Sequence, residues 1–342
     1  MSLKNLNASN KTHKFLIDKL KDKKVFQIYK KFEKNLNLEQ DFIVAVSGGP
    51  DSLALSYLTK VYSINKSLKV KYFIIDHKLR ENSSSETKFV KNLLRKLSIK
   101  LTILKWTGGK PVNNIQSIAR AKRYKLLANK AKKLKINHIL LGHHNDDLIE
   151  NFFIRFLRGS GLNGLVSFDE KSEYEKLNLI RPLLKFSKQD LVYISKKVFG
   201  TFVTDPSNEN DKFKRVKIRN LIKSLQLEGL NTDKFNLTIK NLKSASNSLK
   251  FYVNKNIINN STIFSKKKMI FLNKDFFNQP GEVVFRSLTE IIKIIGKKYY
   301  PVRGKKIDKI VELVKNNRPF KTTLGNCIIK KVNDTIIVSK EH

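Results

Sequence analysis

Short apolar runs alternate with longer amphipathic segments between residues 42 and 184, and this alternation constrains the fold more than any other feature of the chain. The runs are FIVAV (42–46), VKYFIID (70–76), KLTILKW (100–106), HILLG (138–142) and LIRPLL (179–184). The segments between them predict helices at about 52–62, 85–97, 115–134 and 145–157. Strands separated by helix-length segments are typical of parallel sheets, so we predict an α/β fold, a twisted parallel sheet with helices on both faces.

Ligands of such open sheets bind beyond the carboxyl ends of the strands. The residues that directly follow the predicted strands are therefore candidates for a functional site. They are SGGPDS (47–52), HKLR (77–80), GHHNDD (142–147) and the turn near Arg181.

The stretch SGGPDS has the composition of a phosphate-binding loop but carries no lysine, and its spacing differs from that of a Walker-type loop. Glycines permit backbone N–H groups to point inward, serines add hydroxyl donors, and the following helix offers its positive end. The residues concerned are Ser47, Gly48, Gly49, Pro50, Asp51 and Ser52. We predict a pyrophosphate site here, with an ordinary strand–turn–helix as the alternative.

Asp51 is the unusual member of this loop, because a carboxylate beside phosphates is unfavourable unless a cation lies between them. Mg²⁺ is commonly held by one or two carboxylates together with substrate phosphates. We therefore predict that Asp51 binds Mg²⁺; in the alternative it only caps the helix.

The charge balance favours a polyanionic partner. Lys and Arg number 69 against 29 Asp and Glu, a formal net charge of +40, which points to RNA or DNA more than to a small acidic molecule. A lysine-rich composition throughout the chain is the alternative. The single cysteine, Cys327, excludes a disulfide framework and any cysteine-built metal site within the chain. No apolar run is long enough for a membrane helix and no signal peptide is visible, so we expect a cytoplasmic protein.

Two arginines interrupt the apolar stripe of the predicted helix 115–134. Helical spacing places Arg120 and Arg123 on the same side as Leu127, Ala131 and Leu134. Arginine is rarely buried without a partner, so these side chains should meet an anion at the ligand-binding edge of the sheet. Pairing with structural carboxylates is the alternative.

Two carboxylates share one face of the predicted helix 145–157. Asp147 and Glu150 lie opposite an apolar stripe that includes Leu148 and Phe156. They could simply complement the helix dipole, or they could bind a cationic substrate, and Asp146 is hard to separate from Asp147 in that role.

Histidines follow two of the predicted strands. His143, in the pair His143–His144, could hold a phosphate oxygen or relay a proton near neutral pH. The pair lacks the helical spacing of zinc ligands. His77 is a nucleotide-contact or turn residue, and His138 inside a strand is structural.

The chain changes character after residue 205. A basic stretch, KFKRVKIRNLIK (212–223), contains Arg215 and Arg219, and helical spacing continues to about residue 250. Beyond it, strand-like runs mix with predicted helices at 281–296 and 304–316. We predict a domain boundary near 225, a short N-terminal helical extension, and a small α+β C-terminal part.

These motifs together resemble the ATP pyrophosphatases, or PP-loop enzymes, and within them the tRNA(Ile)-lysidine synthases. The matching stretches are SGGPDS, IDHKLR (75–80), ARAKRY (119–124), LGHHNDDLIEN (141–151), RGSGLNGL (158–165), RPLL (181–184) and DPSN (205–208). PVRGKKIDKIVELV and KTTLGNCIIKK in the tail resemble the family more weakly. The resemblance implies an adenine nucleotide alpha hydrolase-like fold over residues 1–225 and a tRNA-binding region over 226–342.

The resemblance also implies a reaction: ATP adenylates the wobble cytidine of a tRNA(Ile) with a CAU anticodon, and free L-lysine then displaces AMP to give lysidine. It implies catalytic roles for Asp51, Arg120, His143 and Asp147, ATP contacts from the loop, His77 and Arg120, and lysine binding by Asp147 and Glu150. Predicted tRNA contacts are Arg123, Arg158, Arg215 and Arg219, with Tyr299 and Tyr300 as stacking candidates. A homodimer is left open.

The rival interpretations are a PP-loop tRNA thiolase and a catalytically inactive tRNA-binding protein. A thiolase needs catalytic or cluster-binding cysteines, which a chain with only Cys327 does not supply. The sequence departs from the family at Leu148 and Asn151, where Gln and Thr are usual, at Lys78 in place of Gly, and at TLGN in place of TLGG. None of these departures removes a charged group to which a role is assigned above.

Overall fold

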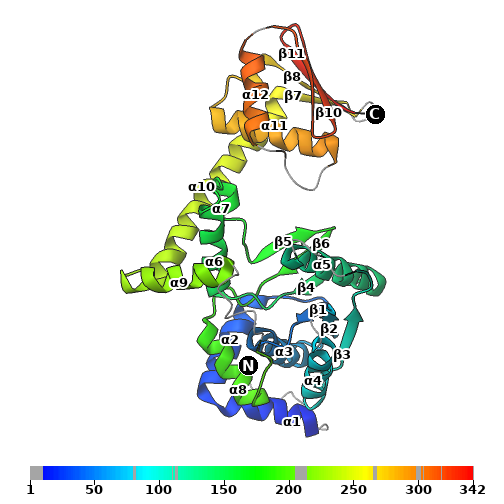
Figure 1. The fold of residues 1–342 in the computed structure, drawn as a ribbon, viewed down its shortest axis with the longest axis vertical. Helices are drawn as coiled ribbons and strands as arrows, with labels where there is room; N and C mark the ends of the chain where they lie inside the picture. The colour runs from blue at the N-terminus through cyan, green and yellow to red at the C-terminus, as the bar shows by residue number, and fades with distance from the viewer. Residues whose placement is uncertain are drawn as a thin grey trace. The chain divides into compact units, whose positions relative to one another are not determined.

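The computed structural model describes residues 11–79, 82–109, 111, 115–204, 214–264, 268–297, 302, 304–316 and 318–341. The chain divides into two compact units, Met1–Phe235 and Asn236–His342. Each unit has its own sheet and its own hydrophobic core (Figure 1). No helix among the described residues is long and apolar enough to cross a membrane.

The first unit contains a six-stranded sheet of order β3-β2-β1-β4-β6-β5. Its strands are β1 (Phe42–Val46), β2 (Val70–Asp76), β3 (Leu101–Lys105), β4 (His138–Leu140), β5 (Lys171–Tyr174) and β6 (Leu177–Ile180). All neighbouring pairs are parallel except β5 with β6. The predicted parallel α/β sheet is confirmed.

Helices cover both faces of this sheet (Figure 1). The helices of this unit are α1 (Lys11–Asp18), η2 (Lys19–Lys21), α2 (Lys23–Leu36), α3 (Pro50–Asn65), α4 (Ser83–Arg95), α5 (Ile115–Leu134), α6 (Asn145–Phe156), α7 (Leu162–Leu165), α8 (Lys188–Phe199) and α9 (Lys214–Leu227). Phe42 and Val44 join the core formed with α2, α3, α4 and α8, while Ile43 joins the core formed with α5. Alternate side chains of β1 thus enter opposite cores, as the period of two in a strand requires.

The sheet ends in a hairpin that the sequence does not predict. Strands β5 and β6 pair with Tyr174 opposite Leu177, so the turn consists of Glu175 and Lys176. Both residues have positive φ, 50° and 67°, a conformation for which Asn and Gly are the usual residues. The run predicted as a strand over 179–184 leaves the sheet after Ile180, because Arg181 begins the turn into α8.

The strand order reverses at β1, which lies between β2 and β4. The loops after β1 and β4 therefore leave the sheet side by side, at the position where open α/β sheets bind ligands. Their approach is close: a Cβ atom on Gly142, after β4, would lie 3.2 Å from the backbone nitrogen of Ser52. Glycine at position 142 allows the two loops to meet.

The second unit is an antiparallel sheet covered by helices. It comprises α10 (Thr232–Asn260, which begins in the first unit), β7 (Ser261–Phe264), β8 (Met269–Leu272), η5 (Lys274–Phe276), α11 (Gly281–Gly296), α12 (Gly304–Lys315), β9 (Lys321–Leu324), β10 (Cys327–Val332) and β11 (Thr335–Lys340). The strand order is β7-β8-β11-β10-β9, and Cys327 is buried in the core beneath α11 and α12. The division between units falls at Phe235, inside α10, whereas the sequence prediction placed a domain boundary near 225, close to the end of α9.

Candidate active site

The glycine loop between β1 and α3 closes around one buried hydroxyl. The Oγ atom of Ser52 accepts hydrogen bonds from the N–H groups of Ser47, at 3.1 Å, and Gly48, at 3.0 Å. It donates to the carbonyl oxygen of Gly49, at 3.0 Å. Ser52 therefore braces the loop, and the anion-binding capacity rests on the first-turn amides of α3, which have no acceptor within the helix, and on the positive end of that helix.

Gly48 is the residue that the loop conformation requires. Its φ is +90°, and a Cβ atom there would lie 2.6 Å from Cγ2 of Val90. The carbonyl oxygen of Gly48 accepts a hydrogen bond from the N–H of Val203, at 3.0 Å. Both the backbone angle and the lack of space exclude a side chain at this position.

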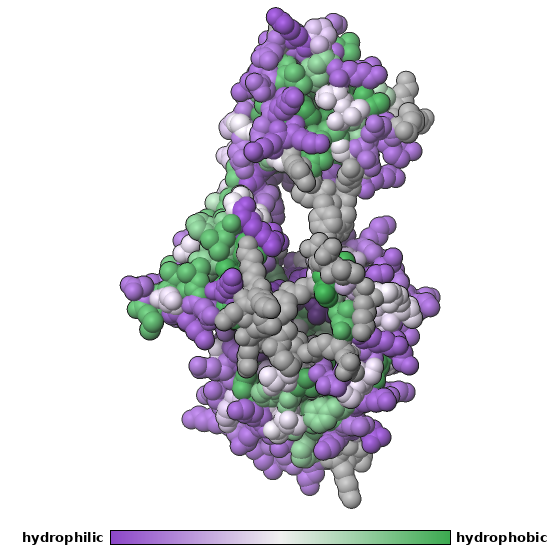
Figure 2. Space-filling model, in the orientation of Figure 1, coloured by the Kyte–Doolittle hydropathy of each residue, from purple (hydrophilic) through white to green (hydrophobic). Residues whose placement is uncertain are grey.

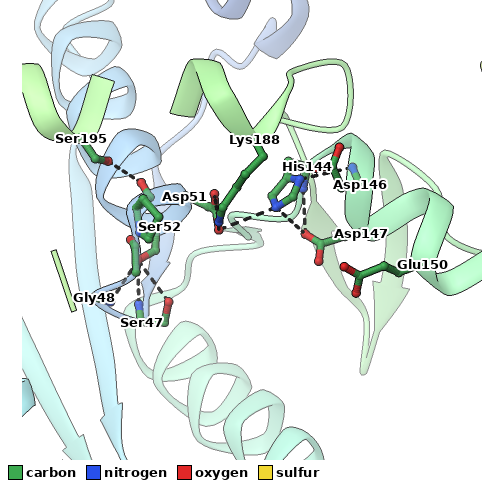
Figure 3. Close-up of polar contacts among 12 residues, drawn as sticks. Ser47, Gly48, Asp51, Ser52, His144, Asp146, Asp147, Glu150, Lys188 and Ser195 are labelled. Carbon is green, nitrogen blue, oxygen red and sulfur yellow. Dashed lines mark hydrogen bonds and ion pairs between the residues drawn. The ribbon is translucent and has the colours of Figure 1, made fainter. Parts of the chain in front are cut away.

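Asp51 does not stand alone in the loop, because a lysine from α8 contacts it (Figure 3). The Nζ atom of Lys188 lies 2.8 Å from Oδ1 and 2.6 Å from Oδ2 of Asp51. Ser187 caps α8 by accepting the N–H of Asp190, and Ser195 donates to the carbonyl oxygen of Pro50, which fixes α8 against the start of α3. The loop therefore has a cationic partner, Lys188, which follows Asp51 by 137 residues in the sequence.

The sequence prediction missed Lys188. A signal for it exists in SKQD (187–190), where Ser followed three residues later by Asp is typical of a helix start. That pattern places Lys188 at the first position of a helix directly after the last parallel strand. It does not show that this helix meets α3.

His144 lies between the loop and the acidic helix α6. The ring atom Nδ1 accepts a hydrogen bond from the backbone N–H of Asp146, at 3.2 Å. The backbone N–H of His144 donates to Oδ2 of Asp147, at 3.0 Å. Its Nε2 atom lies 3.6 Å from Oδ2 of Asp147 and 3.8 Å from Oδ2 of Asp51. One buried imidazole therefore connects the two predicted carboxylates, whereas the sequence prediction gave the functional role to His143.

His143 packs edge-on against Phe168, with ring centroids 5.2 Å apart. Burial lowers the pKa of His143 to about 3; the charges of Arg120 and Arg181 act in the same direction, and Asp147 opposes them. The ring is therefore neutral at pH 7. A neutral imidazole can accept a hydrogen bond or donate one to a phosphate oxygen, and the relay of a proton by His143 stays a prediction.

The three acidic residues of α6 differ in exposure. Asp146 is exposed, Asp147 is half-buried and Glu150 is buried. Burial acts to raise the pKa of Asp147, but His144, His143 and the bond from the amide of His144 lower it below its usual range. Asp147 thus lies beside His144 as a carboxylate, whereas the side chain of Asp146 is exposed.

Glu150 already has a cationic partner. The Nε atom of Arg219, from α9, lies 2.5 Å from Oε1 of Glu150. Oε2 of Glu150 is buried without a hydrogen-bond partner among the described residues. Arg219, predicted as a tRNA contact, is therefore engaged by a carboxylate, while Arg215 of the same helix is exposed.

The predicted arginines of α5 lie where α5 starts, as expected. The guanidinium carbons of Arg120 and Arg123 lie 5.2 and 5.6 Å from the ring centroid of Tyr124, and neither forms an ion pair with a carboxylate within the described part of the chain. Arg181 lies 4.9 Å from the ring of Phe168. The Nε atoms of Arg123 and Arg181 are buried without hydrogen-bond partners in the described residues, and such buried donors are able to bind an anion.

His77 joins the same edge of the sheet from the end of β2. Its ring packs edge-on against Trp106, 5.8 Å between centroids. Burial and the nearby charge of Arg123 lower the pKa of His77 to about 4, against the effect of Asp76. The side chain is neutral and shares its surroundings with Arg123.

The remaining predicted residues lie elsewhere. Arg158 is exposed just after α6. Figure 2 shows mostly hydrophilic side chains on the visible face, with an apolar area over α9, where Leu221 and Leu227 are exposed. His138 contacts Gln40 through Nε2, at 2.9 Å, which fits its structural assignment. Arg80, DPSN (205–208), Tyr299 and Tyr300 lie outside the described residues.

The residues present fit ATP and a magnesium ion. The Gly48 loop and the partnerless Nε atoms of Arg123 and Arg181 suit phosphate groups. No group of at least three His, Cys, Asp or Glu side chains that could hold a metal occurs among the described residues. Mg²⁺ needs fewer protein ligands when phosphates complete its shell, so a single carboxylate such as that of Asp51 is compatible with it.

Comparison with known proteins agrees with this geometry. The PP-loop domain family matches residues 20–225. A tRNA(Ile)-lysidine synthase of Wolbachia sp. subsp. Brugia malayi is 31% identical over 87% of this chain and 70% of its own length. One from Orientia tsutsugamushi is 32% identical over 91% and 71%. A U34-tRNA thiolase from Methanococcus maripaludis with its [4Fe-4S] cluster shares the fold, with a TM-score of 0.56 and 16% identity over 66% of this chain and 80% of that one. The chain belongs to the PP-loop family and, within it, to the tRNA(Ile)-lysidine synthases.

Proposed function

We propose that this protein is a carbon–nitrogen ligase that joins free L-lysine to C2 of the wobble cytidine in the CAU anticodon of a tRNA(Ile), changing the codon read from AUG to AUA. The cytosine O2 attacks the α phosphate of ATP and pyrophosphate leaves. The lysine amine then attacks C2 of the adenylated cytidine and AMP leaves. ATP makes the oxygen of the base a good leaving group.

The observation that carries this proposal is the position of His144, within 3.8 Å of Asp51 and 3.6 Å of Asp147. Asp51 belongs to the loop suited to pyrophosphate, and Asp147 belongs to the helix suited to a cationic amine. Two reagents held by these elements would lie at one end of the sheet, so catalysis consists largely of positioning and charge neutralisation.

In the adenylation step, the loop Ser47–Ser52 holds the pyrophosphate portion and Arg120 neutralises charge that develops on the α phosphate. Mg²⁺, held by Asp51, would supply further neutralisation of the phosphate charge. Neutral His77 and His143 hydrogen-bond the nucleotide, consistent with the low pKa values that burial gives both rings.

In the lysine step, Asp147 and the free Oε2 atom of Glu150 receive the ammonium group of the substrate. Arg219 compensates the charge on the other oxygen of Glu150. This pairing lowers the cost in folding free energy of burying the carboxylate before lysine binds, because an unpaired buried charge is costly.

The net charge of +40 supports a tRNA partner. Arg123, Arg158 and Arg215 are its candidate contacts in the first unit, and an anticodon base is readily displaced from its stack to reach the site. We place the protein in the cytoplasm, where tRNA, lysine and ATP occur together.

A thiolase function is not supported by the residues. Cys327 is the single cysteine and is buried in the antiparallel sheet of the second unit, with its Sγ atom donating to the carbonyl oxygen of Ile292 at 3.4 Å. It has neither the exposure nor the companions that a cluster or a persulfide carrier needs.

The test is transfer of labelled lysine, with ATP and Mg²⁺, to tRNA(Ile) and initiator tRNA, which both carry a CAU anticodon. We expect label on the isoleucine species alone, with one AMP released for each lysine joined. Absence of label from both tRNAs, or ATP turnover that depends on a sulfur donor, would sink the proposal.

A further inference from the structure

The glycine loop presents a charge problem that the pyrophosphate assignment leaves unsolved. Asp51 adds a negative charge at the start of α3, beside the position at which phosphates would bind, and the loop itself contains no lysine or arginine. Magnesium would relieve part of this repulsion. A nucleotide with three phosphates still carries more negative charge than one divalent ion neutralises.

Lys188 lies where an additional cation is needed. Its Nζ atom contacts both oxygens of Asp51, at 2.6 and 2.8 Å, and its side chain comes from the first turn of α8 (Figure 3). The side chain is 39% exposed, so the ammonium group is not enclosed by protein and can reach a ligand at the loop. The hydrogen bond from Ser195 to Pro50 keeps the backbone of α8 against the loop.

A purely structural salt bridge is the competing explanation. Partly exposed Lys–Asp pairs contribute only about 0–1 kcal/mol to stability, and α8 is already docked on α3 by buried side chains such as Leu191 and Ile194. The fold therefore does not depend on this ion pair. A flexible lysine on a rigid helix start is, by contrast, the form in which phosphate-binding loops use a point charge.

We propose that Lys188 is the phosphate-binding cation of the glycine loop: it binds the outer phosphates of ATP and the pyrophosphate that leaves, and Asp51 holds it in place before the nucleotide arrives. This inference rests on the proposed function, since it names a further residue for the same site. Cleavage of the bond between the α and β phosphates leaves its electron pair on pyrophosphate, and Lys188 neutralises that charge without giving up a proton.

The test compares ligands with and without outer phosphates, by calorimetry on the full-length protein. Lys188→Met should weaken binding of ATP and of inorganic pyrophosphate about tenfold or more, the usual magnitude for a charge-assisted contact. Binding of AMP, which lacks the outer phosphates, should not change. Lys188→Arg should restore most of the affinity, because it restores the charge.

Lys185→Met is the matched control. Lys185 lies on the same connection between β6 and α8, but its Nζ atom contacts Glu170, at 2.8 Å, and its side chain is 56% exposed. The Lys185→Met variant should bind all of these ligands with an affinity within about twofold of that of the wild type, because a screened surface charge contributes little.

The outcomes separate this inference from the proposed function. Wild-type binding of ATP and pyrophosphate with unchanged affinity in Lys188→Met overturns the inference alone. An equal loss for ATP and AMP overturns it too, because the lysine would then only support the structure of the site. Failure of the wild-type protein to bind ATP at all overturns the proposed function, and the inference with it.

Discussion

Nε of Arg219 lies 2.5 Å from Oε1 of Glu150, so a cation of the protein occupies one oxygen of a carboxylate that the sequence assigns to the lysine substrate. Burial raises the pKa of Glu150, and the hydrogen bond and charge of Arg219 oppose that effect. The pair also joins α9 to α6, two helices that contact each other. Arg219 therefore stabilises the packing of α9 on α6 and reduces the negative charge that Glu150 presents to a substrate.

Replacing Arg219 should destabilise the protein. Arg219→Gln leaves Glu150 buried without its cation, and we expect a loss of about 1–3 kcal/mol in the free energy of unfolding, less than for a fully buried pair because Arg219 is 37% exposed. Urea denaturation measures it. Arg215→Gln, one turn earlier and exposed, is the control and should change stability by less than about 0.5 kcal/mol. Equal effects of the two substitutions would contradict the prediction.

The same variant should respond to pH in a defined direction. Without Arg219 the pKa of Glu150 rises further, because burial then acts unopposed. A carboxyl group with a raised pKa in the folded state stabilises that state below its ordinary pKa of about 4.5 and loses this contribution as the pH rises through the folded pKa. The difference in unfolding free energy between wild type and Arg219→Gln should thus shrink from pH 8 to pH 5. A constant difference would indicate lost packing instead.

Asp22 should determine part of the acid stability. It caps α2 by accepting the N–H groups of Lys24 and Val25, both at 3.0 Å, and it also accepts the hydroxyl of Tyr193, at 2.8 Å. The bond from Val25, followed by those from Tyr193 and Lys197, lowers the pKa of Asp22 to about 2. Its contribution is present above its ordinary pKa of about 3.8 and is lost as the pH falls from there to about 2.

The free energy of unfolding of Asp22→Ala should therefore decrease less than that of the wild type as the pH falls through this interval. Urea midpoints at pH 5, 3.5 and 2.5 measure the effect. Asp41→Ala is a control, since Asp41 accepts one backbone N–H at a surface turn. If the urea midpoint of Asp22→Ala decreases as steeply with falling pH as that of the wild type, Asp22 does not determine the acid stability.

Local patterns were sufficient to predict many elements of both units. The parallel strands follow from apolar runs such as FIVAV, and the helices at 115–134 and 281–296 begin and end at the predicted residues. The strand Lys171–Tyr174 was missed because its turn uses positive φ at Glu175 and Lys176, residues that carry no turn signal. The apolar stripe predicted for α6 was partly wrong, since Phe156 is 59% exposed where α6 extends past the sheet core.

The sequence predicted the helices and strand ends that carry the candidate residues, but it did not predict their ion pairs. Helical spacing correctly put Asp147 and Glu150 on one face and Arg120 at the sheet edge. Contacts between residues distant in sequence, Lys188 with Asp51 and Arg219 with Glu150, depend on how α8 and α9 pack, and no local period encodes that packing. Burial lowers the pKa of His143 and leaves the ring neutral at pH 7. The sequence alone does not reveal this burial.

Gly48 should be the least replaceable residue of the loop. Gly48→Ala forces a side chain to adopt φ +90° with its Cβ 2.6 Å from Val90, and we expect a loss of about 2–4 kcal/mol together with weaker ATP binding. Gly159→Ala is the matched control, because Gly159 also has positive φ, 67°, but nothing lies within 4 Å of the added atom. It should cost about 1–2 kcal/mol, from backbone strain alone, and leave the ATP affinity unchanged.

Asp51→Ala should separate chemistry from tRNA binding. Asp51 is half-buried at the start of α3 and contacts Lys188 and His144, so the substitution removes the carboxylate assigned to Mg²⁺ without opening the core. We expect loss of ATP-dependent lysine transfer by at least about a hundredfold, since charge neutralisation at phosphates carries most of such a barrier. Filter binding of the tRNA should stay within about twofold, because Asp51 bears no charge that attracts a polyanion. Asp190→Ala should affect neither measurement, because Asp190 is only partly exposed in the first turn of α8 and is paired with Lys24 at 3.4 Å, not with the loop. Full transfer activity in Asp51→Ala would show that the metal is held elsewhere, and a parallel loss of tRNA binding would show that the loop shapes the RNA site as well.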